Sequence, residues 1–152
     1  MTVEGVVELI VELEVPARAE FVALARMVVA SVASSRRDLP PERIDDLRLA
    51  VSEACTNAIE AQRAAAVADP VLVRVWEDDE RLDVSVEDHG HGFDPNRLLT
   101  HPPVTDPDRL NFERGLGIPL MRRLVDQVEI SSSARGTAVR MTLRSRRKVT
   151  GT

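Results

Sequence analysis

The stretch Glu53-Ala54-Cys55-Thr56-Asn57 places a carboxylate and a carboxamide four residues apart. Positions four apart in a helix project from the same face, so Glu53 and Asn57 are expected to lie side by side. Such a pair can hold a hydrated divalent cation or orient a proton acceptor, whereas an ordinary exposed Glu–Asn pair carries no chemistry. Small apolar residues recur around it at helical spacing and predict a helix over residues 41–65: Leu47, Ala50, Val51, Ala54, Ala58 and Ala61.

Two elements are expected before this helix. Residues 6–15 alternate branched apolar side chains with glutamate, which predicts a half-buried strand. Pro16 then favours a helix start. An amphipathic helix is predicted over residues 17–33, because four apolar residues recur there at helical spacing: Phe21, Leu24, Val28 and Val32.

The remaining elements follow the central helix. Residues 71–77 and 82–87 both alternate at period two around a short polar connection, which predicts a β-hairpin. After an aperiodic stretch, we expect a helix over 116–125 and strands over 128–132 and 138–143. The order β-α-α-β-β-loop-α-β-β predicts an α+β fold, with a mixed, mostly antiparallel sheet and helices on one face, forming a single domain over residues 1–152.

A second candidate motif is Asp88-His89-Gly90-His91-Gly92, directly after the second hairpin strand. Alternate glycines let the backbone turn sharply and approach a ligand closely. A carboxylate at the end of a strand can accept a hydrogen bond from an exocyclic amine. By itself this motif is also compatible with an ordinary Asp-Gly turn.

A third candidate motif is the sequence Glu-Arg-Gly-Leu-Gly-Ile at residues 113–118, predicted at the entry to a helix. A helix N-terminus exposes backbone N–H groups and favours anions, so phosphate is the natural ligand. Arg114 could add a charge-assisted contact. The alternative is an ordinary glycine-rich helix start.

In this order the motifs resemble the N box and the two glycine boxes of the GHKL ATPases, the superfamily of gyrase, heat-shock chaperones and histidine kinases. Gly136-Thr137 is similar to the superfamily's final strand motif, and the resemblance spans residues 6–143. The short chain, the Glu-x-x-x-Asn helix, segment 113–118 and the missing dimerisation-and-phosphoacceptor helices most resemble the anti-sigma factor serine/threonine kinases. The resemblance implies a two-layer α/β sandwich of the histidine-kinase-like ATPase type.

The resemblance also implies a role for individual residues. Asn57 would be the Mg²⁺ ligand, and Glu53 the proton acceptor near the γ-phosphate of ATP. Asp88 would bind the adenine amine, assisted through water by Thr137. Residues 91–114 would form the mobile ATP lid. Further nucleotide-binding positions implied by the resemblance are Gly90, Gly92, Arg114, Gly115, Leu116 and Gly117.

Such a kinase would use ATP and Mg²⁺ to phosphorylate a serine or threonine of a STAS-domain anti-sigma factor antagonist. It would sequester a sigma factor and act as a homodimer. Two other functions stay open: a non-catalytic interaction module that only binds ATP, and the detached catalytic domain of a histidine kinase. The second is disfavoured because few residues precede the helix that carries Glu53 and Asn57.

The chain departs from the family pattern at two places. After Asn57 the family often continues Ala-Ile-x-His-Gly, whereas residues 58–62 are Ala-Ile-Glu-Ala-Gln, with an acid near the place of the histidine. This difference could weaken phosphate binding or alter the dimer surface. The expected lid carries few glycines and three prolines, so its closure could differ as well: Pro102, Pro103 and Pro107.

Composition narrows the classes of protein further. A net charge of −5 and a pI near 5.3 argue against nucleic-acid binding, and we interpret the basic run at 144–148 as solvated. The single cysteine and the three histidines match no zinc spacing. No signal peptide is visible, and apolar runs such as residues 27–32 are too short to span a bilayer. A cytoplasmic protein without direct nucleic-acid or membrane binding is therefore expected.

Overall fold

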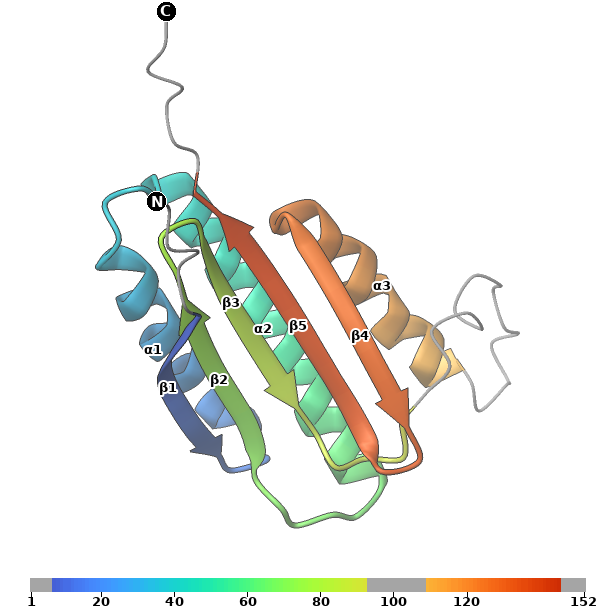
Figure 1. Cartoon of the computed structure of the whole chain (residues 1–152). Coiled ribbons are helices and arrows are strands. Elements are labelled where there is room, and N and C mark those ends of the chain that lie inside the picture. Colours follow the sequence, from blue (N-terminus) through green and yellow to red (C-terminus); the bar gives the residue numbers. More distant parts are fainter. Residues whose placement is uncertain (1–6, 93–108, 146–152) are drawn as a thin grey trace, which may run out of the picture.

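The computed structural model describes residues 7–92 and 109–145, with side chains described for 7–92 and 117–145. Figure 1 shows one sheet with all the described helices on a single face. The strands are β1 (Glu8–Val15), β2 (Val71–Glu77), β3 (Arg81–Glu87), β4 (Gln127–Ser133) and β5 (Gly136–Arg144). The helices are the short 3-10 helix η1 (Ala19–Phe21), α1 (Val22–Ser34), α2 (Pro41–Ala64) and α3 (Arg109–Leu124).

The sheet has the strand order β1-β2-β3-β5-β4, and each of its four described pairings is antiparallel. β3 therefore lies at the centre, between β2 and β5. α2 runs behind the middle of the sheet, flanked by α1 and α3 (Figure 1). This arrangement confirms the α+β fold class and the placement of the helices on one face. The expected mixed character of the sheet is wrong for the described strands, whose pairings are all antiparallel.

The core lies between the sheet and α2. The strand register makes Val75, Val84 and Met141 neighbours in one row across β2, β3 and β5, and all three are fully buried. On the helix side the row belongs to the same core as Leu47 and Val51 of α2. Burying an aliphatic side chain of this size contributes about 1.5–3 kcal/mol, so the core fixes α2 on the sheet.

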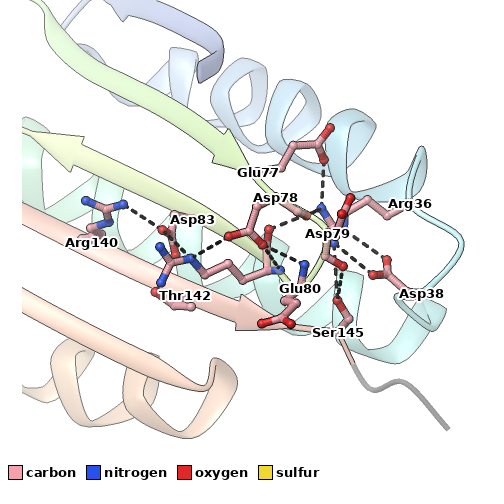
Figure 2. A network of polar contacts seen from close by, with 11 residues as sticks. Arg36, Asp38, Glu77, Asp78, Asp79, Glu80, Asp83, Arg140, Thr142 and Ser145 are labelled. Atoms are coloured by element: carbon pink, nitrogen blue, oxygen red, sulfur yellow. Dashed lines mark hydrogen bonds and ion pairs between the residues drawn. The ribbon is translucent and has the colours of Figure 1, made fainter. Parts of the chain in front are cut away.

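A buried arginine holds the α1–α2 connection against the end of the sheet that carries the β2–β3 turn (Figure 2). The Arg36 guanidinium, only 9% exposed, makes two bonds to the Asp38 carboxylate at 2.9 and 3.1 Å. It also donates to Glu77 Oε2 at 3.1 Å, to the Asp78 carbonyl at 2.8 Å and to Ser145 Oγ at 3.4 Å. One side chain thus joins the inter-helix connection, the β2–β3 turn and the residue after β5.

Two predicted element boundaries are wrong. The helix expected over 17–33 begins as a 3-10 turn, and regular α1 starts only at Val22. The helix expected over 116–125 begins earlier, at Arg109. An interior glycine costs a helix only about 1 kcal/mol relative to alanine, so the glycine-rich segment does not end α3. The start of the strand predicted at residue 6 lies outside the described residues.

None of the described helices combines the length and the apolar composition that a bilayer crossing requires.

Candidate nucleotide-binding site

A pocket opens between α2 and the ends of β3 and β5. Four residues predicted from the sequence line it: Asn57, Asp88, Gly92 and Thr137. Apolar side chains of α2, the sheet and α3 form the rest of its wall, among them Ala58, Val86, Val139 and Met121. Pockets with mostly apolar walls and a few placed polar groups are typical of small-molecule sites, and such walls suit a flat aromatic ring.

Asp88 is held in place by the backbone around it. It follows the last residue of β3 and is 8% exposed. Its Oδ1 accepts the N–H of Gly90 at 2.9 Å and the N–H of Thr137 at 3.3 Å. Its own N–H donates to the Thr137 carbonyl at 2.9 Å. The carboxylate is therefore fixed before any ligand arrives, which suits recognition of an exocyclic amine.

Two glycines of the site adopt backbone angles that other residues rarely reach. Gly92 has a φ of 75°, and a Cβ there would stand 2.0 Å from the Ser133 carbonyl oxygen. Gly136 has a φ of 137°, and its Cβ would stand 2.0 Å from the carbonyl oxygen of Asp88. Only glycine permits both the angle and the approach. The first glycine box and the β4–β5 turn consequently press against each other beside Asp88.

Glu53 and Asn57 meet α3 at Gly117. A Cβ built on Gly117 would be 2.7 Å from Glu53 Oε2 and 3.2 Å from Asn57 Nδ2. Both side chains of α2 thus reach the same point of α3, as their four-residue spacing predicts. Both residues are half-buried at the side of the pocket. An amide oxygen is one of the hard donors that Mg²⁺ prefers, so Asn57 fits that ion, and the Glu53 carboxylate lies beside it.

Comparison with known proteins identifies the family. Residues 15–143 match the family described as "Histidine kinase-like ATPase domain". The chain belongs to this family. The members of this ATPase family that it resembles include the serine-protein kinase RsbW of Bacillus velezensis, 38% identical over 136 residues, with 87% of this chain and 83% of the relative covered. The RsbW kinase of Bacillus subtilis is 37% identical over the same coverage.

Solved structures show the same fold. The RsbU and RsbW domains of Rv1364c from Mycobacterium tuberculosis match with a TM-score of 0.65 at 20% identity, covering 93% of this chain. This chain spans about a third of that solved chain, at 34%. The SiaB–SiaC complex of Pseudomonas aeruginosa matches with a TM-score of 0.62 at 12% identity, covering 89% of both chains.

These matches confirm the family predicted from the three motifs, including its RsbW-like serine-protein kinase branch. The chain is an ATPase-family domain, and ATP is the nucleotide that such a domain binds. The role of each individual residue remains a prediction.

The second glycine box of this ATPase domain belongs to α3. Arg114, Gly115 and Leu116 fall in the first half of α3, and their side chains lie outside the described residues. Most of the predicted lid, residues 91–114, also lies outside them. The expected helix N-terminus at 113–118 is wrong, because α3 begins at Arg109 and both glycines are interior. Phosphate binding by free N–H groups of a first helical turn therefore does not apply there.

Two residues beside the ATPase pocket were not predicted as site residues. Ser132 Oγ lies 2.8 Å from Thr137 Oγ1 and so orders the hydroxyl that lines the pocket. Gln62 is completely buried, accepts the N–H of His89 and donates to the carbonyl of Asp69. A sequence signal for Gln62 did exist: it continues the buried i, i+4 row of Ala54 and Ala58, where a polar side chain is out of place.

Proposed function

We propose that this chain is an ATP-dependent serine/threonine protein kinase that acts as an anti-sigma factor. It phosphorylates a STAS-domain anti-sigma factor antagonist and sequesters a sigma factor. The family match and the similarity to RsbW serine-protein kinases over most of both chains support the proposal. The observation that carries it is the convergence of Asn57, Asp88, Gly92 and Thr137, from three separate parts of the chain, on one pocket.

Asp88 and Thr137 are proposed to bind the adenine end of ATP. The fixed Asp88 carboxylate accepts the exocyclic amine, and the apolar walls formed by Ala58, Val86 and Val139 enclose the ring. Because the carboxylate is already oriented, binding does not require it to be ordered. A base with a carbonyl in place of the amine would face the carboxylate with like partial charge and bind more weakly.

Asn57 and Glu53 are proposed to act at the phosphate end. Asn57 would hold Mg²⁺, which when bound neutralises charge on the phosphate oxygens. Glu53 would accept the proton of the attacking serine hydroxyl. The serine oxygen then bonds to the γ-phosphorus while the bond from that phosphorus to the bridging oxygen breaks, and ADP leaves. The approach of Gly117 to both side chains supports this placement, because it restricts where the two can lie.

Titration of the purified chain with ATP, with and without Mg²⁺, tests the nucleotide site. We expect saturable binding in the wild type. In Asp88→Ala the affinity for ATP should fall by roughly 30- to 100-fold, which corresponds to the loss of one charge-assisted hydrogen bond. Asn57→Ala should bind with little dependence on Mg²⁺. A wild type that does not bind ATP would refute the proposal.

Incubation with ATP and a STAS-domain protein from the same organism tests the kinase step. Phosphoserine or phosphothreonine should appear on that protein, and Glu53→Gln should slow its formation by roughly 100-fold or more while ATP still binds. Partner binding without any phosphotransfer would instead identify a non-catalytic interaction module. We propose in addition that the chain is one domain. We also propose that it pairs with a second copy, and light scattering at several concentrations would test this pairing.

A further inference from the structure

The side chain of Gln62 is completely buried at the end of α2, yet its amide carries both a hydrogen-bond acceptor and a donor. Its Oε1 accepts the backbone N–H of His89 at 3.0 Å. Its Nε2 donates to the carbonyl oxygen of Asp69, in the connection that leads into β2. A buried amide with both functions satisfied ties three segments together: the end of α2, the α2–β2 connection and the loop after β3.

The same loop rests directly on the backbone of α2. A Cβ on Gly90 would stand 2.9 Å from the Ala61 carbonyl oxygen, so the loop backbone lies closer to α2 than a residue with a side chain would allow. Ala61 precedes Gln62, and Gly90 follows His89. The hydrogen bond and the close packing therefore act on neighbouring residues of the two segments, and together they set the distance between α2 and the loop.

Asp88 lies between two anchors as a result. On one side, both its N–H and its Oδ1 are bonded to Thr137 of β5. On the other side, the next residue, His89, is bonded to Gln62 of α2. The pocket is bounded by these two elements, because α2 supplies Asn57, Ala58 and Ala61 and β5 supplies Thr137 and Val139. Removing the Gln62 side chain would delete the hydrogen bond that links the residue after Asp88 to α2.

We infer that Gln62 is a positioning residue that fixes the Asp88 loop against α2 and thereby sets the selectivity of the pocket for adenine. The inference rests on the proposed function, because it assigns Asp88 to the adenine amine. Glutamine is suited to this position because one flat group both accepts from His89 and donates to Asp69. A methionine of similar length offers neither function, and a glutamate lacks the donor.

The test compares three ligands in the wild-type chain and in Gln62→Met: ATP, inosine triphosphate and inorganic tripolyphosphate, each with Mg²⁺. Inosine triphosphate carries a carbonyl where adenine has its amine. For Gln62→Met we expect the Kd of ATP to rise roughly tenfold, the equivalent of one or two net hydrogen bonds. The Kd values of inosine triphosphate and tripolyphosphate should change less than about threefold, so that the preference for ATP shrinks.

Thr142→Val is the matched control. Thr142 is also buried, and its hydroxyl donates to Asp83 Oδ1 at 2.6 Å, at the far end of β5 from Thr137. It removes a buried polar contact outside the pocket and should keep the wild-type preference for ATP. An unchanged preference in Gln62→Met would overturn the inference, and so would an equal loss of all three ligands. Failure of the wild type to bind ATP would overturn the proposed function and the inference together.

Hydrogen exchange of the wild-type chain provides a second measurement that does not depend on any variant. The His89 amide should exchange slowly, although its side chain is exposed, because its N–H is bonded to buried Gln62. Exchange of this amide at the rate of an open loop would overturn the inference, even if Gln62→Met fails to fold.

Discussion

Gly117 of α3 leaves no room for a methyl group beside Glu53, since a Cβ there would stand 2.7 Å from Glu53 Oε2. The atom in the way is the end of a flexible side chain and not backbone. Glu53 can therefore yield without unfolding the chain, but its carboxylate must leave its place.

Gly117→Ala should consequently separate stability from activity. Alanine is the better helix former, so the free energy of unfolding should stay constant or rise by up to about 1 kcal/mol. Phosphotransfer should fall by roughly 10- to 100-fold, because the proton acceptor is displaced. Urea unfolding and a phosphotransfer assay measure the two quantities, with Glu53→Gln as the reference for complete loss of the base. Normal phosphotransfer in Gly117→Ala would contradict the role given to Glu53.

Gly136→Ala should act in the opposite way, on the fold itself. Its φ of 137° disfavours any side chain, and the Cβ would meet the carbonyl of Asp88, which is backbone. We expect a loss of about 3 kcal/mol in the free energy of unfolding, together with weakened ATP binding. Gly90→Ala should lower the free energy of unfolding by less, because its Cβ would stand 2.9 Å from the Ala61 carbonyl oxygen, a milder clash. Equal losses for the two variants would show that the angle at Gly136 is not strained.

The Arg36–Asp38 pair should make stability depend on acid pH. Burial by itself would raise the pKa of Asp38, but the hydrogen bonds from Arg36 and Ser145 and the charge of Arg36 outweigh it and hold the pKa below its usual 3.8. A lowered folded-state pKa stabilises the chain above the unfolded-state value, and this contribution is lost as the pH falls through the folded-state pKa.

Asp38→Asn should therefore cost about 1–2 kcal/mol at pH 7, and the difference from wild type should shrink below about pH 4. Urea unfolding at pH 7 and pH 3 measures it. Asp45→Asn is the matched control, since its pairing with Arg48 is exposed and should contribute less than about 0.5 kcal/mol. A difference for Asp38→Asn that persists undiminished at pH 3 would contradict the ion-pair explanation.

Cys55 should report unfolding. Burial raises the pKa of its thiol to about 12, so at pH 8 it is protonated as well as inaccessible. Its reaction with a thiol reagent at pH 8 should be at least roughly 10³-fold slower in the native chain than in the urea-denatured chain. Rapid labelling under native conditions would show that α2 opens locally.

The sheet and its helices could be predicted because their signals are local. Period-two alternation over 71–77 gave that strand its observed bounds, and the alanine stripe gave α2 to within one residue. Asp88 and Thr137 line the same pocket as Asn57, as the family resemblance implied. Their roles at a nucleotide stay predictions that the resemblance implies.

The remainder depends on contacts between distant segments. The early start of α3 was missed because its glycines were interpreted as a helix boundary, whereas α3 continues through them. Gln62 was noted only as a departure from the family pattern. Its partners, Asp69 and His89, are 7 and 27 residues away, and no local pattern indicates them. A side chain that positions a loop becomes recognisable only when both ends of its contact are in place.

The buried Arg36 links segments that lie far apart in the sequence. Its contacts reach Glu77 and Ser145, which are 41 and 109 residues further along the chain. The pairing of β5 with β3, which ends at Arg81 and Arg144, places Ser145 beside Arg36. A chain that lacks β5 and the residue after it would hold the Arg36 guanidinium without the Ser145 acceptor. The Arg36 guanidinium therefore has its full set of acceptors only when the α1–α2 connection, the β2–β3 turn and the end of β5 are together.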